Sequence, residues 1–373
     1  MKNSYPKLYV GPMSKLCVDS VLEYNSGKKN MLGLLPSRRQ VETKELGGGY
    51  VNSWSTETFS EYVRSSGSTI IQRDHAGPSQ GANLDDGECS LFYDVDCGIR
   101  LIHIDPWKKF RDVEEASNTT FNLIKKCLEK NPDTRFEVGT EEAIRPMSPK
   151  DLASFLQSLR SKSEDVFSAI DYGVVQSGTS VVEDRNIGSF NPEKSKEMCD
   201  IVRSHGLLSK EHNCDYLTPS QIRDRMKCGV DAFNIAPEFG VTQTRILLRL
   251  LEDHSINDLK MSFIKKCVGS RKWEKWVLPG EKEDIFLAQI CGHYNFTSTE
   301  AAECYDALAG KASFEKTSWI GPKHKAPFTP ILVSDIFAHT CQATLLVKGF
   351  FPDLESPELS AVSTRMSFKF CAQ

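Results

Sequence analysis

The sequence lacks several features that would assign it to a specialised class of protein. It has no uninterrupted run of about 18 apolar residues, the length that a membrane-spanning helix requires. The first nine residues contain Lys2, Pro6 and Lys7 and no apolar stretch, so we expect no secretory signal peptide. No segment is of low complexity. These absences favour a protein of the cytoplasm that has no membrane partner.

An excess of basic charge is also missing. Lys and Arg total 46 against 50 Asp and Glu, which gives a formal net charge of −4. Proteins that bind nucleic acids non-specifically rely on a diffuse basic field, so we expect no nucleic-acid partner. Hydrophobic residues make up 39% and charged residues 26% of the chain, a balance typical of a globular enzyme and too apolar for a disordered chain.

Cysteine is plentiful but lacks a motif. The 12 cysteines are scattered from Cys17 to Cys371, and no two have CxxC spacing. In a long chain without a secretory signal, this distribution indicates reduced, mostly buried side chains; a disulfide-bonded arrangement is the less favoured alternative.

Short β-like runs recur along the first 250 residues. Eight are predicted, at Lys7–Val10, Asn30–Leu35, Thr69–Gln72, Arg100–Ile104, Thr134–Val138, Tyr172–Val175, Gly206–Ser209 and Ala232–Ile235. Between them, apolar residues recur at helical spacing, as in Val18, Val21 and Leu22. Strands that alternate with helices form βα units, and eight such units close an α/β (β/α)₈ TIM barrel.

A different pattern follows the eighth strand. A long helix is predicted from Gln243 to Glu252, followed by further helical sequence. We therefore divide the chain into a barrel at residues 1–250, which carries the active site, and a mainly helical extension at residues 251–373 that packs on the barrel.

Acidic and imidazole side chains end several of the predicted strands. In a TIM barrel the active site lies at the carboxyl ends of the strands, where the connecting loops converge. We predict that His75, His212, Asp105 and Glu137 bind a divalent metal, Zn²⁺ foremost, because imidazole and carboxylate ligands suit this ion. Taken singly, each of these residues is equally consistent with an ordinary hydrogen-bonding role.

Two carboxylates are candidates for proton transfer. Asp74 precedes His75 directly, and Glu141 follows the fifth strand, so both are expected near the metal as catalytic residues. The alternative for Asp74 is a partner that fixes the tautomer of a histidine.

Cationic and polar groups at the same strand ends suit an anionic substrate. Guanidinium groups bind phosphate and carboxylate in bidentate geometry, and we assign this role to Arg38, Arg39 and Arg73. An ion pair of Arg38 or Arg39 with Glu42 or Glu45 is the alternative. Further substrate contacts are expected from polar residues after strands six to eight, namely Gln176, Gly178, Thr179, Ser180, Asp215 and Asn234.

The strand ends resemble those of the tagatose-bisphosphate aldolase accessory-subunit family, which is related to the class II, metal-dependent fructose- and tagatose-bisphosphate aldolases. The resemblance covers about residues 5–250 and rests on short stretches in matching order. They are Gly48–Tyr50 with Thr56–Val63, Asp74–His75 with Gly77–Pro78, Ile102–Asp105, Gly139–Glu141, Val174–Gln176 with Gly178, and Glu211–His212 with Asp215–Tyr216.

The resemblance implies roles for individual residues. It places Asp74 as the acid/base aspartate, His75 and His212 as metal-binding histidines, and Asp105 and Glu137 as carboxylates near the metal. Asn234 matches an asparagine that holds the substrate.

Two departures from the aldolase pattern bear on the substrate. Where the catalytic aldolases have another metal-binding histidine after strand six, this chain has Gln176 and Ser177. Where they have a Gly/Ser phosphate loop after strand seven, it has Asn213, Cys214 and Asp215.

The leading hypothesis is a metal-dependent carbon–carbon lyase that acts on a phosphorylated or acidic sugar-like substrate through a metal-stabilised enediolate. A non-catalytic accessory subunit of an aldolase and a metal-dependent sugar epimerase are the alternatives. A homo-oligomer, or a complex with an aldolase subunit, is the expected assembly.

Overall fold

The computed structural model describes residues 5–26, 32–67, 69–311, 317–320 and 325–328. The part of the predicted helical extension from residue 329 onward therefore lies outside the described residues. None of the described helices is both long and apolar enough to cross a membrane. All ten cysteines in the described ranges are free, and seven of them are buried.

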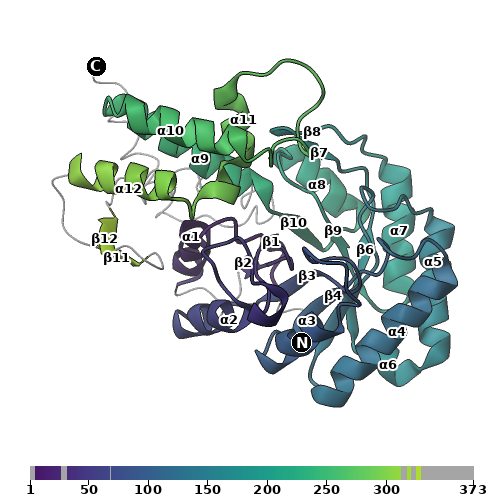
Figure 1. The fold of residues 1–373 in the computed structure, drawn as a ribbon. Coiled ribbons are helices and arrows are strands. Elements are labelled where there is room, and N and C mark those ends of the chain that lie inside the picture. The colour runs from purple at the N-terminus through teal and green to yellow at the C-terminus, as the bar shows by residue number, and fades with distance from the viewer. Residues whose placement is uncertain (1–4, 27–31, 68, 312–316, 321–324, 329–373) are drawn as a thin grey trace.

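Eight parallel strands form the centre of the molecule (Figure 1). They are β1 (Leu8–Val10), β2 (Leu32–Leu34), β3 (Gln72–Ala76), β4 (Leu101–Ile104), β5 (Arg135–Val138), β6 (Ile170–Val175), β9 (Leu208–Glu211) and β10 (Ala232–Ile235). Their order is β2-β1-β10-β9-β6-β5-β4-β3. The outer strands β2 and β3 meet through the parallel bridges Leu34–Ile71 and Ser37–Asp74, which nearly closes the sheet into a barrel. The predicted TIM-barrel class is confirmed.

The strands lie close to their predicted positions. β3 shows the largest difference, because it begins at Gln72, where the predicted strand ends. Arg73, Asp74 and His75 are therefore strand residues rather than residues of the following turn. β9 is displaced in the same direction, to Leu208–Glu211.

Helices surround the barrel on its outer face (Figure 1). They are α1 (Lys15–Asn25), α2 (Thr56–Ser65), α3 (Glu88–Asp96), α4 (Val113–Lys130), α5 (Pro149–Lys162), α6 (Glu164–Ser168), α7 (Pro192–Ser204), α8 (Pro219–Cys228) and α9 (Pro237–Asp253), with a 3₁₀ turn at Lys44–Leu46. Local sequence encodes several of their starts. Ser55, Ser148 and Thr218 each form a capping box with the residue three positions later, which satisfies free backbone N–H groups in the first turn.

The described extension packs on α9. It contains α10 (Asn257–Gly269), α11 (Asp284–Cys291), a 3₁₀ turn (Gly292–Asn295) and α12 (Thr299–Lys311), followed by the hairpin strands β11 (Thr317–Ile320) and β12 (Lys325–Phe328). A second apolar core joins Leu247 and Leu251 of α9 to Phe263, Ala288 and Cys304. A domain boundary at residue 250 stays a prediction, since α9 belongs to both cores.

The barrel interior changes from apolar to polar toward the carboxyl ends of its strands. Tyr9, Leu101 and Tyr172 belong to an apolar cluster inside the barrel. One step along the strands, the buried side chains of Glu137 and Lys210 form an ion pair at 3.2 Å. Side chains alternate along a strand, so polar residues two positions apart line the same interior face. This layering directs the reactive groups to one open end.

A buried ion pair connects β3 to the outer helices. The Arg73 guanidinium donates to both carboxylate oxygens of Asp94 in α3, at 2.8 and 2.6 Å, and to the carbonyl oxygen of Val41 at 2.7 Å. Both charged side chains are fully buried. The substitution Arg73→Met should lower the free energy of unfolding by about 3–5 kcal/mol, because it leaves the Asp94 carboxylate buried without its partner.

Urea unfolding measures this change. The matched substitution Arg223→Met, on the exposed side of α8, should change the free energy of unfolding by less than about 0.5 kcal/mol. Equal effects of the two substitutions would contradict the structural role of the pair.

Candidate metal centre

Three imidazole rings meet at the carboxyl end of the barrel. His75 lies in β3, His103 in β4, and His212 directly after β9. The ring centroids are 5.0 Å apart for His75 and His103, 5.2 Å for His75 and His212, and 4.8 Å for His103 and His212. Residues separated by up to 137 positions in the sequence thus converge on one point.

An irregularity in β3 brings two adjacent side chains to this point. Successive residues of a regular strand point to opposite faces. The register of β3 against β4 shifts between Arg73 and Ala76, and His75 has a φ of 44°. Asp74 and His75 can therefore both face the barrel axis. A left-handed conformation at a non-glycine residue costs on the order of 1–3 kcal/mol, and such strain is concentrated at functional sites.

Each imidazole donates a hydrogen bond from the nitrogen that faces away from the centre. Nδ1 of His75 lies 2.7 Å from the Asp105 carboxylate, and Nε2 of His212 lies 2.6 Å from the Glu137 carboxylate. Nε2 of His103 lies 3.1 Å from the carbonyl oxygen of Gly139. These oxygens can only accept a hydrogen bond, so they fix the tautomer of each ring.

The opposite nitrogens face the centre. They are Nε2 of His75, Nδ1 of His103 and Nδ1 of His212, and with one carboxylate oxygen of Asp74 they lie within 4.8 Å of one another. The backbone N–H of His75 makes a long contact of 3.4 Å with Nδ1 of His103, consistent with an unprotonated nitrogen there. Histidines that bind metals characteristically donate their other N–H to a carboxylate or carbonyl oxygen. The four ligand atoms are therefore placed so that they could hold a metal ion.

Two carboxylates flank this centre. Oε2 of Glu141 lies 3.3 Å from Nε2 of His75 and 3.8 Å from Nδ1 of His212. Oδ1 of Asp74 lies 3.7 Å from Nδ1 of His103 and has no hydrogen-bond partner. The side chains of His75, Asp74 and Glu141 are 16%, 17% and 16% exposed, whereas that of His103 is fully buried. A small molecule can therefore reach the centre from the side of these three residues.

The charges of the site are strongly coupled. Burial alone would raise the pKa of the Asp74 and Glu141 carboxyls, but positive charge on His75 outweighs it and lowers both pKa values. Burial would lower the pKa of His212, but the Glu137 carboxylate raises that pKa to about 9. Likewise, Asp74 and Glu141 raise the pKa of His75 well above its ordinary value. The cluster therefore stabilises positive charge at its centre, which a divalent cation would also supply.

Two of the predicted metal ligands, Asp105 and Glu137, lie in positions that differ from those predicted. Asp105 and Glu137 contact the nitrogens of His75 and His212 that face away from the centre. Asp105 also accepts a hydrogen bond from the backbone of Trp107 at 3.1 Å, and Glu137 pairs with Lys210. Their contacts orient the imidazoles, and coordination of a metal by these two carboxylates stays a prediction.

Two of the three arginines predicted to bind the substrate, Arg38 and Arg73, are engaged by oxygens of the protein. The buried Arg38 guanidinium donates to Glu42, Asp85 and the carbonyl oxygen of Gly77, so the ion-pair alternative holds for this residue. Arg73 donates to Asp94 and to backbone oxygens. Both guanidinium groups are held by protein oxygens and are not available to a substrate. Arg39, in contrast, is exposed.

The residues after β6 hold the loops of the barrel mouth. The Gln176 amide donates to the carbonyl oxygens of Thr140 and Arg145, both at 2.9 Å. The Thr179 hydroxyl donates to the carbonyl oxygen of His212 at 2.8 Å. Gly178 accepts from Arg225, and the backbone N–H of Ser180 donates to Asn186. These contacts position the chain around His212, and substrate contact by these four residues stays a prediction.

Asp215 and Asn234 lie at the end of the barrel near α9. Oδ1 of Asp215 accepts the backbone N–H groups of Ala236 and Glu238, at 2.9 and 2.8 Å. Asn234 is 4% exposed, and neither its amide nitrogen nor its oxygen has a hydrogen-bond partner. A buried amide without partners is costly, so Asn234 is a candidate for contact with a bound molecule.

Sequence reasoning missed His103 as a candidate ligand. The signal was present in the strand itself: Leu101 faces the barrel interior, and the period of two places His103 on the same face one step closer to the open end.

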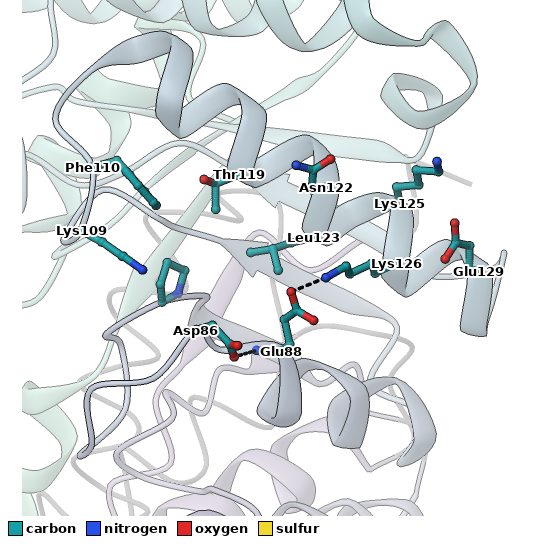
Figure 2. A pocket seen from close by; sticks show the side chains of 11 residues that line it. Asp86, Glu88, Lys109, Phe110, Thr119, Asn122, Leu123, Lys125, Lys126 and Glu129 are labelled. Carbon is teal, nitrogen blue, oxygen red and sulfur yellow. Dashed lines mark hydrogen bonds and ion pairs between the residues drawn. The ribbon is translucent and has the colours of Figure 1, made fainter.

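A separate groove lies outside the barrel, between α3 and α4. Its volume is about 380 Å³, and Lys109, Asn122 and Lys126 are among its lining residues (Figure 2). Lys126 forms an ion pair with Glu88 across it. No residue of the metal centre lines this groove.

Comparison with known proteins identifies the fold. No protein-family model and no curated protein sequence matches the chain. A probable tagatose 6 phosphate kinase from Sinorhizobium meliloti 1021 is similar in structure, with a TM-score of 0.72 and 15% identity over 91% of this chain and 99% of that one. A fructuronate-tagaturonate epimerase from Cohnella laeviribosi gives a TM-score of 0.54 and 10% identity, over 92% and 79% of the two chains. A fructose-bisphosphate aldolase from Campylobacter jejuni gives 0.46 and 12%, over 81% and 90%.

Asp215 generates a prediction about pH. Burial, and then the charge of Glu238, raises the pKa of Asp215 to about 7. Its unfolded value is about 3.9, so the folded state prefers the protonated form and loses stability as the pH rises from about 4 to about 7. In Asp215→Asn, which keeps the Oδ1 acceptor, the loss of unfolding free energy between pH 5 and pH 8 should be smaller by on the order of 2 kcal/mol.

Urea unfolding at the two pH values tests this difference. Asp133→Asn, at an exposed turn, serves as the control and should keep the pH dependence of the unmodified protein. An Asp215→Asn variant with that same dependence would contradict the assignment.

Proposed function

We propose that this protein is a divalent-metal-dependent enzyme, with Zn²⁺ as the favoured ion, that enolises an anionic sugar-like substrate as a carbon–carbon lyase. The observation that carries the proposal is the set of three imidazoles with fixed tautomers, whose remaining nitrogens face one centre. Imidazole nitrogens are preferred ligands of zinc, and catalytic zinc sites commonly use three protein ligands and leave a position open.

The residues present fit such an ion. His75, His103 and His212 would hold it, and Asp74 and Glu141 would balance part of its charge. Oδ1 of Asp74 is buried without a hydrogen-bond partner, as expected for an oxygen whose interaction partner is a cation or a substrate. When bound, a divalent cation supplies Lewis-acid polarisation of substrate oxygens.

The chain's own residues supply the remaining chemistry. The lowered pKa of Asp74 keeps its carboxylate ionised, so Oδ1 can accept the proton of a substrate hydroxyl as the carbon–carbon bond breaks, and return it in the reverse direction. Glu141 faces the same centre from the loop after β5 and can accept a second proton. The unpaired Asn234 amide can donate to a substrate oxygen. Asp105 and Glu137 keep His75 and His212 oriented throughout.

An epimerase is the second candidate. Epimerisation shares the enolisation step, and it needs acid/base groups on two sides of the reacting carbon. Asp74 in β3 and Glu141 in the loop after β5 flank the centre, which meets this requirement. The epimerase with a similar fold supports the same possibility. Identification of the products by NMR separates the two reactions, since only the lyase yields two fragments.

An accessory subunit without catalytic activity would have no need for the three oriented imidazoles. Metal analysis therefore separates this alternative from both enzymes.

The roles of Asp74 and His103 can be separated by substitution. Asp74→Asn should retain the metal and lose activity by about 10²- to 10⁴-fold, because the amide cannot accept the proton. His103→Ala should lose both metal and activity. Metal content is measured by plasma mass spectrometry, and enolisation by NMR as deuterium exchange from solvent into dihydroxyacetone phosphate. Full exchange activity in Asp74→Asn, or full metal content in His103→Ala, would refute these roles.

The contact behind His75 generates a further prediction. In Asp105→Asn, an amide that donates toward Nδ1 of His75 would favour the tautomer with the proton on Nε2, the nitrogen that faces the centre. Metal affinity should fall by about 10- to 100-fold, measured by competition with a chromophoric chelator. Glu129→Gln, in the groove outside the barrel, is the matched control. Equal affinities of the two variants would show that Asp105 does not set the tautomer.

A further inference from the structure

Three cationic side chains from separate segments belong to loops at the carboxyl end of the barrel. Arg39 follows β2, Lys108 follows β4, and Lys275 lies between α10 and α11 of the extension. All three are exposed, and within the described part of the chain none of them forms a salt bridge. Like charges that lie near one another repel, and an anion bound between them would relieve this repulsion.

Direct contacts connect the extension to the loop after β2. The backbone N–H of Tyr50 donates to the carbonyl oxygen of Arg39 at 3.1 Å, and the ring of Tyr50 lies 4.8 Å from that of Tyr294. Lys275 packs on the rings of Tyr294 and Trp276, with Nζ 5.1 Å from the centroid of Tyr294 and 4.4 Å from that of Trp276. A hydrogen bond of 3.2 Å from Nε1 of Trp276 to the Tyr294 hydroxyl fixes the two rings. Lys275 is thus oriented by a packed aromatic cluster.

The segment that carries Lys275 is also anchored to the barrel mouth. The hairpin of β7 (Val181–Val182) and β8 (Arg185–Asn186) follows β6, and Figure 1 shows the segment between α10 and α11 beside it. The backbone N–H of Glu183 donates to the carbonyl oxygen of Trp276 at 2.8 Å, and the Glu183 carboxylate accepts from Lys282 at 2.7 Å. These contacts hold the segment at the carboxyl end of the strands.

Lys108 links the cations to the metal centre. It lies three residues after Asp105, whose carboxylate holds both His75 and the backbone of Trp107. Burial and the charge of Arg39 lower the pKa of Lys108, whereas Asp105, Glu141 and Asp74 act in the opposite direction. Burial, Arg39, Lys272 and Lys108 together lower the pKa of Lys275 to about 8. The three cations therefore interact electrostatically with one another, and Lys108 also interacts with the acidic residues of the centre.

We propose that Lys275 joins Arg39 and Lys108 in a subsite that binds the phosphate group of a phosphorylated substrate, so that the extension is part of the binding site. A phosphate dianion compensates more of the charge of three cations than a single carboxylate does, and Arg and Lys are its usual ligands. Anion binding by the three cations does not depend on the proposed function. The statement that the bound phosphate belongs to the substrate of the metal centre does rest on it.

Binding of inorganic phosphate to the full-length protein tests the subsite. Isothermal titration should show that Arg39→Gln, Lys108→Gln and Lys275→Gln each weaken phosphate binding by about tenfold, the effect of one lost charge-assisted hydrogen bond. Two other lysines provide matched controls, whose substitution should leave the phosphate affinity unchanged. Lys109→Gln alters the residue next to Lys108, which faces the outer groove (Figure 2), and Lys265→Gln alters an exposed residue of α10.

The outcomes that overturn the proposal are specific. If Lys275→Gln binds phosphate like the Lys265→Gln control, the extension does not contribute. If acetate binds as tightly as phosphate, the subsite is not selective for the dianion. Titration both before and after removal of divalent ions with a chelator keeps this test separate from the metal proposal. Phosphate affinity that survives chelation belongs to the cations, whatever the fate of the metal centre, and affinity that disappears on chelation would contradict the subsite.

Discussion

The hydrogen bonds behind the three imidazole rings constrain the carboxyl end of the barrel. Asp105, the carbonyl oxygen of Gly139 and Glu137 each fix one ring, and each bond leaves the other nitrogen of that ring facing the centre. The acceptors are buried, so the rings have little freedom to turn. Rings held in this way would take up a cation without first reorganising.

The layers of the barrel interior lower the energetic cost of burying these charged and polar groups. Apolar side chains fill its lower layer, the ion pair of Lys210 and Glu137 fills the next, and the imidazoles lie above. Lys210 and Glu137 thus compensate each other's buried charge, and Glu137 also accepts a hydrogen bond from His212, which offsets part of the cost of desolvation. Only Asp74, His75 and Glu141 are partly exposed, so access to the centre is confined to one side.

Sequence alone predicts the barrel because βα alternation is a local signal, and all eight strands lie within a few residues of their predicted positions. It also places Asp74, His75, Glu141 and His212 at the same end. Contacts between segments that are distant in the sequence could not be predicted from the sequence. The bulge that turns both Asp74 and His75 inward depends on register against β4, and the capture of Arg73 by Asp94 depends on the packing of α3. His103 was not named as a ligand, although it lies in β4 two positions after Leu101, which belongs to the apolar cluster inside the barrel.

The central claim is that one cation is held by nitrogens from β3, β4 and the end of β9. Anomalous diffraction from crystals of the metal-loaded protein, recorded on both sides of the zinc absorption edge, tests it most directly. The account predicts a single strong peak within bonding distance of Nε2 of His75, Nδ1 of His103 and Nδ1 of His212. A map without a peak at this point, or with a peak coordinated by Asp105 and Glu137 in place of the imidazoles, would contradict it.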